Sequence, residues 1–214
     1  MASHDALKLK INEIFHSLQG ESSRAGFPTV FIRFSLCNLR CGYCDTPYAY
    51  EDGDFMSIDE IVSKVGEFGC KRVEITGGEP MFQDGVIELA ERFIADGYQV
   101  MMETNGTFEL SGLPDELIKI VDIKCPDSGA ADTFVEANLA YIRKSDEIKF
   151  VISSVNDFEW AVEKTAEKGL LSLCTVNISP AIGEVDAEEA AQWILDSGLD
   201  FRLNLQMHKY LDIP

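Results

Sequence analysis

Strand-like and helix-like segments alternate along this chain, and that alternation restricts its fold more than any other feature. Runs of β-branched and aromatic residues predict strands, and apolar residues at helical spacing predict helices between them. Since neighbouring parallel strands need a crossover, which a helix usually fills, the pattern indicates an α/β fold with a parallel sheet. The predicted strands are 29–35, 72–76, 99–103, 120–124, 147–152, 172–178 and 201–205.

Helix signals fall between these strands. Ser57 and Glu60 have capping-box spacing at the start of the first helix. Further helices are expected near 157–167 and 187–195, and the signal within 127–141 is weaker. The apolar face of the first helix contains Ile58, Ile61, Val62, Val65 and Phe68, and that of the second contains Val86, Leu89, Ala90, Phe93 and Ile94.

The chain length limits how the sheet can close. A full eight-fold barrel needs about 250 residues, and this chain has 214, of which 46% are hydrophobic. An open doubly wound sheet remains possible, but an incomplete (β/α) barrel of about six to seven strands fits better. We expect one domain over 1–214, with 1–7 disordered. Both the open sheet and the incomplete barrel bind ligands at the carboxyl ends of their strands, and polar residues collect at those positions in this sequence.

Net charge narrows the class of partner. The chain has 18 basic and 37 acidic residues, a formal charge of −19, and such a field repels a phosphate backbone. We therefore expect a small-molecule or protein partner and no nucleic acid. No apolar run approaches the roughly 18 residues of a membrane span, and the first residues lack signal-peptide features. We expect a cytoplasmic protein without a membrane partner.

Three of the six cysteines crowd into an eight-residue loop after the first predicted strand. In a cytoplasmic chain, this crowding indicates metal binding rather than disulfides. Three thiolates can hold three corners of a four-iron cluster and leave the fourth iron open for a ligand, whereas electron carriers normally use four thiolates. The loop cysteines are Cys37, Cys41 and Cys44, and the isolated ones, typical of buried positions, are Cys70, Cys125 and Cys174.

A zinc site is the alternative interpretation of the loop. It would need a fourth ligand from Cys70, His16 or Asp45. Structural zinc sites usually pair their ligands in two separated clusters, and this chain has a single triplet. The iron-sulfur interpretation therefore fits the spacing better.

The segment Cys37-Asn38-Leu39-Arg40-Cys41-Gly42-Tyr43-Cys44 resembles the radical S-adenosylmethionine superfamily, which carries this spacing. Thr76-Gly77-Gly78-Glu79-Pro80 is similar to the glycine-rich motif of that superfamily, although alone it would be an ordinary turn. The resemblance implies an incomplete barrel of the radical S-adenosylmethionine type. It also implies a 4Fe-4S cluster on the three loop cysteines, with S-adenosylmethionine on the open iron.

The flanking residues are similar to the 7-carboxy-7-deazaguanine synthase family of queuosine-precursor biosynthesis. The similar positions are 15–21 (Phe-His-Ser-Leu-Gln-Gly-Glu), Arg33, 44–46 (Cys-Asp-Thr) and Pro214. This resemblance implies a lyase that converts 6-carboxy-5,6,7,8-tetrahydropterin to 7-carboxy-7-deazaguanine with loss of ammonia, by a Mg²⁺-dependent radical ring contraction. A glycyl-radical enzyme activating protein shares the cysteine spacing, but its site must admit a polypeptide loop.

The family resemblance implies a role for particular residues, and no catalytic residue beyond those that position cofactor and substrate. Thr46 would bind Mg²⁺, although it is equally a turn residue before Pro47. Arg33 would pair with the substrate carboxylate, since a guanidinium can form two parallel hydrogen bonds, but without the resemblance an outward-facing strand residue is equally plausible. The implied substrate contacts are Leu18, Gln19, Gly20, Arg33, Thr76 and Pro214, the last through a terminal carboxylate. The implied S-adenosylmethionine contacts are Tyr43, Cys44, Asp45, Gly78, Ile123, Lys124, Cys125, Asn177, Ile178, Ser179 and Pro180.

The resemblance also implies partners. The small-molecule substrate is a pterin, and a flavodoxin- or ferredoxin-type donor would supply electrons. A homodimer is expected from the family alone. An electron-transfer or zinc-binding module, the alternative from another class, would need neither substrate nor S-adenosylmethionine.

Overall fold

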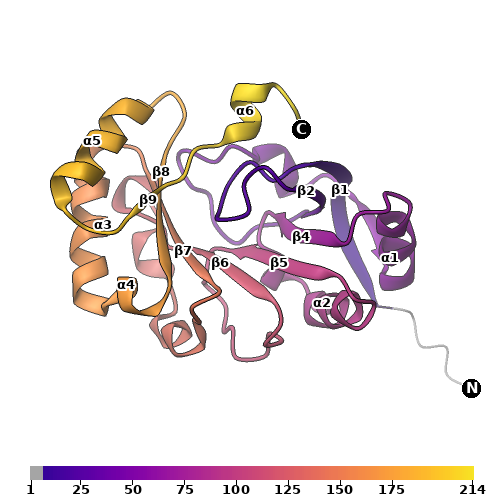
Figure 1. The fold of residues 1–214 in the computed structure, drawn as a ribbon. Helices are drawn as coiled ribbons and strands as arrows, with labels where there is room; N and C mark the ends of the chain where they lie inside the picture. Colours follow the sequence, from indigo (N-terminus) through magenta and orange to yellow (C-terminus); the bar gives the residue numbers. More distant parts are fainter. Residues whose placement is uncertain (1–6) are drawn as a thin grey trace, which may run out of the picture.

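The computed structural model describes residues 7–214, and its strands form one sheet (Figure 1). The strand order is β3-β1-β2-β4-β5-β6-β7-β8-β9. From β2 onward every neighbouring pair is parallel, whereas β1 pairs antiparallel with both β2 and β3. The strands are β1 (Lys8–Leu18), β2 (Pro28–Phe34), β3 (Asp54–Ser57), β4 (Arg72–Gly77), β5 (Gln99–Thr104), β6 (Ile118–Asp122), β7 (Glu147–Ile152), β8 (Thr175–Pro180) and β9 (Arg202–Leu203).

The two edge strands, β3 and β9, do not pair with each other, so the predicted incomplete barrel is confirmed. Figure 1 shows α1 and α2 at one end of the sheet and α3, α4 and α5 at the other. In the described residues, no helix is both long enough and apolar enough to span a bilayer. The helices are α1 (Ile58–Gly66), α2 (Val86–Ala95), α3 (Val155–Lys168), α4 (Leu170–Leu173), α5 (Ala187–Ser197) and α6 (Met207–Leu211).

The capping box predicted for the first helix is present. The Ser57 N–H donates to Glu60 Oε2 at 2.7 Å, and the Glu60 N–H donates to Ser57 Oγ at 3.3 Å. These reciprocal bonds satisfy two donors that the first turn cannot pair internally, so α1 begins at Ile58. The segment 127–141, where the helix signal in the sequence is weak, forms short 3-10 helices. They are η3 (Pro126–Ser128), η4 (Ala131–Thr133) and η5 (Glu136–Tyr141).

Within residues 7–214 the sheet has nine strands, two or three more than the six to seven expected. The seven predicted strands correspond to the parallel set, which is β2 and β4 to β9, and β1 and β3 were missed. In β1 the pairing register with β2 shifts between Ile11 and Glu13. The buried residues Leu9, Ile11 and Ile14 therefore do not keep the period of two that reveals a strand.

The predicted strand 172–178 was wrong at its start. Leu170–Leu173 is the short helix α4, and β8 begins at Thr175. Gly169, in the left-handed region with φ 62°, ends α3 and begins α4. A short apolar run does not distinguish helix from strand, so sequence periodicity could not place this boundary.

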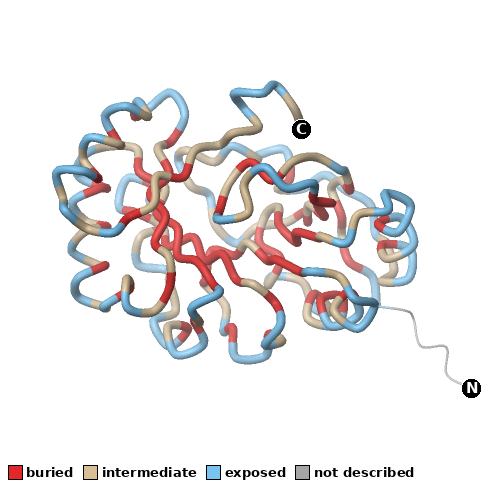
Figure 2. The backbone as a smooth tube through the Cα atoms, in the orientation of Figure 1, coloured by how far each residue is buried: buried red, intermediate tan, exposed pale blue. Residues whose placement is uncertain are grey.

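The two faces of the sheet differ in chemistry. Side chains alternate along each strand, so Val73 and Ile75 of β4 join the hydrophobic core against the helices, while Glu74 and Thr76 face the other way. Figure 2 shows the buried residues concentrated along the central strands. The opposite, inner face carries charged residues and lines a cavity.

Of residues 1–7, which the sequence analysis expected to be disordered, the structure describes only Leu7. Residues 1–6 lie outside the described residues, so the disorder predicted there stays a prediction. The side chain of Leu7 lies directly beside Gly85, which has no Cβ to obstruct it.

Candidate active site

One cavity of about 840 Å³ opens at the carboxyl ends of the parallel strands. The segment after β1, the cysteine loop after β2 and the ends of later strands contribute to its walls. In an α/β sheet this edge is where ligands bind, as the sequence predicted. The cavity therefore joins segments that lie far apart in the chain.

Most of the residues implicated by the sequence line this cavity. They include the three loop cysteines and both groups expected to contact small molecules. The lining members are Leu18, Gln19, Gly20, Arg33, Cys37, Cys41, Tyr43, Cys44, Asp45, Thr46, Thr76, Gly78, Lys124, Asn177, Ser179, Pro180 and Pro214.

Three expected cofactor contacts do not reach the cavity with their side chains. Ile123, Cys125 and Ile178 belong to the hydrophobic core, with at most 6% of each residue exposed. Alternation explains Ile178, because its neighbours Asn177 and Ser179 face the cavity. Any cofactor contact from these three positions has to come from backbone atoms.

The cysteine loop is held against the end of β4 by glycines. The Gly78 N–H donates to Phe34 O at 2.9 Å, and the Glu79 N–H donates to Leu36 O at 2.8 Å. A Cβ at Gly78 would overlap the Leu36 carbonyl, and Gly77 has a φ of 122°. The glycine-rich motif thus lets two backbones meet and fixes the start of the loop.

The three loop thiols are free, partly exposed and directed to one cavity. Burial raises the pKa of Cys37 and of Cys41, while the Lys124 ammonium opposes the rise. The Leu39 N–H also donates to Cys37 Sγ at 3.4 Å. A cysteine binds metal as the thiolate, which such donors and nearby positive charge stabilise. A bound metal centre adds further positive charge.

The donor set fits a cluster better than a single ion. Across residues 7–214, no three His, Cys, Asp or Glu side chains gather closely enough for one metal ion. Each thiolate of a four-iron cluster binds a different iron, so the three sulfurs need not converge on one point. The loop therefore suits a 4Fe-4S cluster, and no four-ligand zinc site is formed in this part of the chain.

Arg33 reaches the cavity from β2, with 16% of its side chain exposed. Its Nε donates to Glu13 Oε1 at 2.7 Å, and its guanidinium carbon lies 5.6 Å from the centre of the Phe15 ring. These contacts orient the guanidinium, and within residues 7–214 neither Nη group makes a hydrogen bond, so both can meet a carboxylate. The outward-facing alternative for Arg33 is therefore wrong.

The inner face of the sheet holds a charge network that the sequence analysis missed. Lys149 Nζ lies 3.2 Å from Glu21 Oε2 and 3.9 Å from Asp122 Oδ2, and it also donates to Glu103 Oε1. Burial disfavours the charge on Lys149, but these carboxylates outweigh it and raise the lysine pKa. The signal available was Glu147 and Lys149, two charged residues at alternate positions of the predicted strand 147–152.

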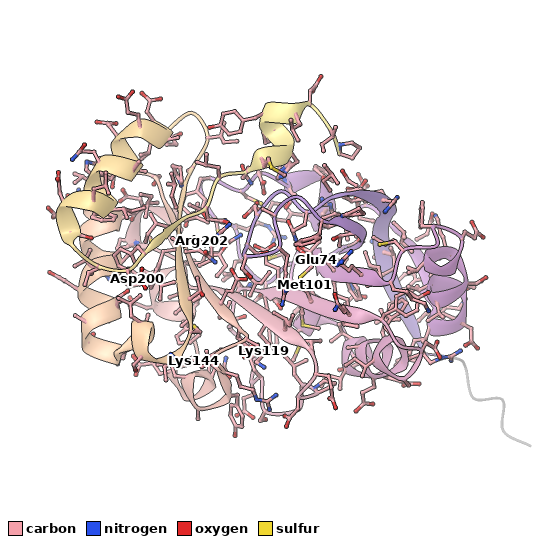
Figure 3. The ribbon with its side chains drawn as sticks, in the orientation of Figure 1. Glu74, Met101, Lys119, Lys144, Asp200 and Arg202 are labelled. Carbon is pink, nitrogen blue, oxygen red and sulfur yellow. The ribbon has the colours of Figure 1, made fainter. Side chains whose placement is uncertain are left out.

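Glu74 lies deeper on the same face, opposite Met101 of β5 in the strand register (Figure 3). Its Oε2 accepts a hydrogen bond from Gln19 Nε2. Burial and the nearby charge of Glu103 raise the pKa of Glu74 well above its usual range. Gln19 is 3% exposed, so its carboxamide forms its hydrogen bonds inside the protein, and its nitrogen donates to Glu74.

Two further carboxyl groups connect the strand ends. Glu79 is fully buried and accepts bonds from Thr104 Oγ1 and the Asn105 N–H, both at 2.7 Å. Burial raises its pKa to about 7. Asp122 accepts a 2.6 Å bond from Lys124, whereas its buried Oδ1 has no partner among the described residues.

Comparison with known proteins identifies the family. Residues 31–194 match the model of the Radical SAM superfamily. The chain is 42% identical to a 7-carboxy-7-deazaguanine synthase of Koribacter versatilis, over 96% of this chain and 98% of that one. The chain belongs to the 7-carboxy-7-deazaguanine synthase family of the radical SAM superfamily. The family member of Chlorobaculum tepidum is 38% identical over 96% of this chain and 95% of that one.

Solved structures agree on the fold. QueE from Escherichia coli superimposes with a TM-score of 0.74 at 24% identity, over 94% of this chain and 95% of that one. SuiB from Streptococcus suis, bound to S-adenosylmethionine, gives a TM-score of 0.55 over 82% of this chain and 48% of that one. The sequence resemblance to the 7-carboxy-7-deazaguanine synthase family is thus confirmed, and the alternative of a glycyl-radical enzyme activating protein is not favoured.

Proposed function

We propose that this protein is a 7-carboxy-7-deazaguanine synthase. It converts 6-carboxy-5,6,7,8-tetrahydropterin to 7-carboxy-7-deazaguanine with loss of ammonia, a radical ring contraction in the queuosine pathway. Near full-length similarity to synthases carries this conclusion. The cavity supports it, because the cysteine loop and the segment from Leu18 to Gly20 share its walls.

The cofactors are a 4Fe-4S cluster, S-adenosylmethionine and Mg²⁺. Cys37, Cys41 and Cys44 would hold the cluster. Together, cluster and S-adenosylmethionine supply one-electron chemistry that removes a hydrogen atom from an unactivated C–H bond. The protein's own task is then to hold the substrate still and to exclude competing hydrogen donors.

S-adenosylmethionine would lie along the cysteine loop and the later strand ends. Tyr43 and Asp45 flank Cys44, while Asn177, Ser179 and Pro180 enter the cavity from β8. Burial alone would raise the pKa of Asp45, but a hydrogen bond from Gln206 and the charge of Lys149 lower it. Asp45 therefore presents an ionised carboxylate to this part of the cavity. The remaining cavity-lining residues proposed for this pocket are Gly78, through its backbone, and Lys124.

The substrate would meet the segment between β1 and β2 through its backbone. The Gln19 N–H donates to Phe27 O at 2.9 Å, and Gln19 O accepts from the Gly26 N–H at 2.7 Å. In residues 7–214, the Gly20 N–H has no such partner and is available to a ligand. Gln19 would then shape the segment, and Gly20 would donate to the ring.

Arg33 and Thr76 would complete the substrate site. The free Nη groups of Arg33 match a carboxylate, which the pterin carries. The Thr76 hydroxyl lies 3.4 Å from Glu103 Oε2 and faces the same cavity. Pro214 also lines the cavity, on the side of the C-terminal segment.

Thr46 is the proposed protein ligand of Mg²⁺. It precedes the 3-10 helix η1 (Pro47–Tyr50), as the turn alternative expected, but its hydroxyl makes no capping bond and it lines the cavity. Magnesium keeps six oxygen ligands and readily retains water. Substrate and water would therefore complete its shell, so Mg²⁺ should bind appreciably only when substrate is present.

The reaction needs an external electron donor and a small-molecule substrate. We propose a flavodoxin- or ferredoxin-type donor, a cytoplasmic location and a homodimer, from the family resemblance. The net charge of −19 supports the expectation that nucleic acid is not a partner.

The deciding experiment is an anaerobic assay of the reconstituted protein. It contains S-adenosylmethionine, Mg²⁺, a chemical reductant and the carboxylated tetrahydropterin, and it follows the deazapurine and ammonia. Formation of both products is expected. Cleavage of S-adenosylmethionine without any deazapurine would preserve the superfamily and overturn the proposed substrate.

A further inference from the structure

Glu21 follows the proposed substrate segment and pairs with Lys149 in the inner-face charge network, but the proposed function gives it no role. Its N–H donates to Gln19 Oε1 at 2.9 Å, and its side chain, 18% exposed, lines the cavity. The residue therefore extends the Leu18 to Gly20 segment by one position, towards the interior.

The Glu21 carboxylate accepts hydrogen bonds from three donors. Gln206 Nε2 donates to Oε1 at 3.1 Å, while Asn204 Nδ2 and Lys149 Nζ approach Oε2 at 3.1 and 3.2 Å. Two of these donors belong to the C-terminal segment, defined here as residues 204–214. One carboxylate thus links the substrate segment to β7 and to the C-terminal segment.

The C-terminal segment depends on such polar contacts. The strand before it, β9, is only two residues long, and α6 has no buried residue. Beyond Asn204 and apart from Glu21, the bonds from this segment to the rest of residues 7–214 come from the Met207 N–H, which donates to Gly20 O at 2.9 Å, and from Gln206 Nε2, which donates to Asp45 Oδ2 at 3.0 Å. Little apolar burial holds α6, which lies above β9 at the edge of the molecule (Figure 1).

The neighbours of Glu21 are themselves fixed. Arg202 donates to Asn204 Oδ1 at 2.8 Å, and Asn204 Nδ2 also donates to Ser179 Oγ at 2.8 Å. Figure 3 shows Arg202 on the β8–β9 side of the sheet. Asn204 is therefore anchored independently, whereas within residues 7–214 the Gln206 carboxamide bonds only to the carboxylates of Glu21 and Asp45.

We propose that Glu21 is a positioning residue that holds the C-terminal segment over the cavity and aligns it with the substrate segment. His208, Lys209 and Pro214 line the cavity from this segment, so its placement shapes the site. Glu21 acts on the reaction through these neighbours, which rests on the proposed function of the cavity. The Glu21→Gln variant keeps the size but turns one acceptor into a donor that faces donors.

Hydrogen exchange of the substrate-free protein tests the proposal without any turnover. In Glu21→Gln, amides of residues 204–214 should exchange at least tenfold faster, because a hydrogen bond to a charged group is worth roughly a tenfold change in equilibrium or more. Gln206→Leu, which removes one donor and leaves Glu21 intact, should loosen the same peptide. The double variant should accelerate exchange by less than the product of the two single-variant factors, because both changes break the same Glu21–Gln206 contact.

Asp146→Asn is the matched control. Asp146 is a buried carboxylate that accepts three bonds, from the Lys119 and Arg143 N–H groups and from Lys119 Nζ, and it does not line the cavity. This variant should lower the melting temperature and leave exchange in 204–214 unchanged. Equal exchange of 204–214 in wild type and Glu21→Gln, or equal acceleration in Asp146→Asn, would overturn the proposal.

Steady-state kinetics then distinguish misalignment of the substrate site from a general loss of enzyme activity. Glu21→Gln should raise the substrate KM about tenfold or more while substrate-free cleavage of S-adenosylmethionine stays within about twofold of wild type. A loss of both activities in equal measure would contradict an alignment role. If the wild-type enzyme makes no deazapurine, the proposed function fails, and the exchange result still decides whether Glu21 holds the segment.

Discussion

Lys149 is the position where stability depends most directly on the inner-face charges. Its ammonium contacts three carboxylates, those of Glu21, Glu103 and Asp122, and only 8% of its side chain is exposed. Lys149→Met keeps the aliphatic volume and removes the charge. The three acids then lose the cation that offsets their burial.

Removing one partner of a buried ion pair costs about 3–5 kcal/mol, because the other charge remains buried without compensation. For a chain of this size, each kcal/mol lowers the melting temperature by roughly 2–4 °C. Lys149→Met should therefore melt roughly 6–20 °C below wild type near pH 8. Scanning calorimetry of the cluster-free protein, at several pH values, provides the measurement.

The pH dependence follows from the pKa of Glu103. Burial already raises that pKa, with Lys149 opposing the rise, so loss of Lys149 raises it further. A carboxyl group with a raised folded-state pKa stabilises the protein below its unfolded pKa and loses that contribution as pH rises. The difference in melting temperature between wild type and Lys149→Met should thus shrink from pH 8 towards pH 5.

A second variant tests the same reasoning from the other side. Lys149→Met combined with Glu103→Gln removes one of the uncompensated charges, so it should recover part of the lost stability at pH 8. A single variant that melts within about 2 °C of wild type at pH 8, or a deficit equal at pH 5 and pH 8, would refute the account.

Three other changes test separate parts of the structure. Cys41→Ala should abolish the absorbance and paramagnetic signal of the reconstituted cluster together with S-adenosylmethionine cleavage, and turnover retained in this variant would contradict the ligand assignment. Arg33→Lys should raise the substrate KM about tenfold, since an ammonium cannot form two parallel bonds, while substrate-free S-adenosylmethionine cleavage changes little; equal losses would indicate a structural role. Ser57→Ala removes the cap of α1 and should lower the melting temperature by roughly 2–4 °C, whereas an unchanged value would show that the capping box adds nothing.

Local sequence signals predicted the parallel part of the sheet. Seven strands and the capping box at Ser57 follow from periodicity and spacing, which depend on residues close in the chain. The strand β1 was missed because its irregular pairing breaks the alternation. Whether Leu170 to Leu173 turns as a helix depends on Gly169 and on packing, which a short apolar run does not record.

The candidate site was predicted unevenly for a similar reason. Cys37, Cys41 and Cys44 are close in sequence, so their chemistry could be inferred from spacing alone. Lys149 and Glu21 lie 128 positions apart in the chain, and their contact exists only because β7 and the β1–β2 segment face one cavity. Ile123, Cys125 and Ile178 show the reverse, since position in the chain suggested a contact, but all three side chains belong to the core. Strand alternation accounts for Ile178, whereas Ile123 and Cys125 follow the end of β6.

The incomplete barrel explains why such charges occur in the middle of strands. A closed eight-stranded barrel fills its interior with branched apolar side chains, whereas this sheet leaves a cavity of about 840 Å³. Glu74 and Lys149 stand where a closed barrel would place those apolar side chains. Buried charge is tolerated only when it is paired and hydrogen-bonded. Glu74 accordingly accepts a bond from Gln19 in the segment that covers it, and Lys149 pairs with carboxylates that include Glu21. The same network that makes the cavity polar therefore also ties the substrate segment and the C-terminal segment to the sheet.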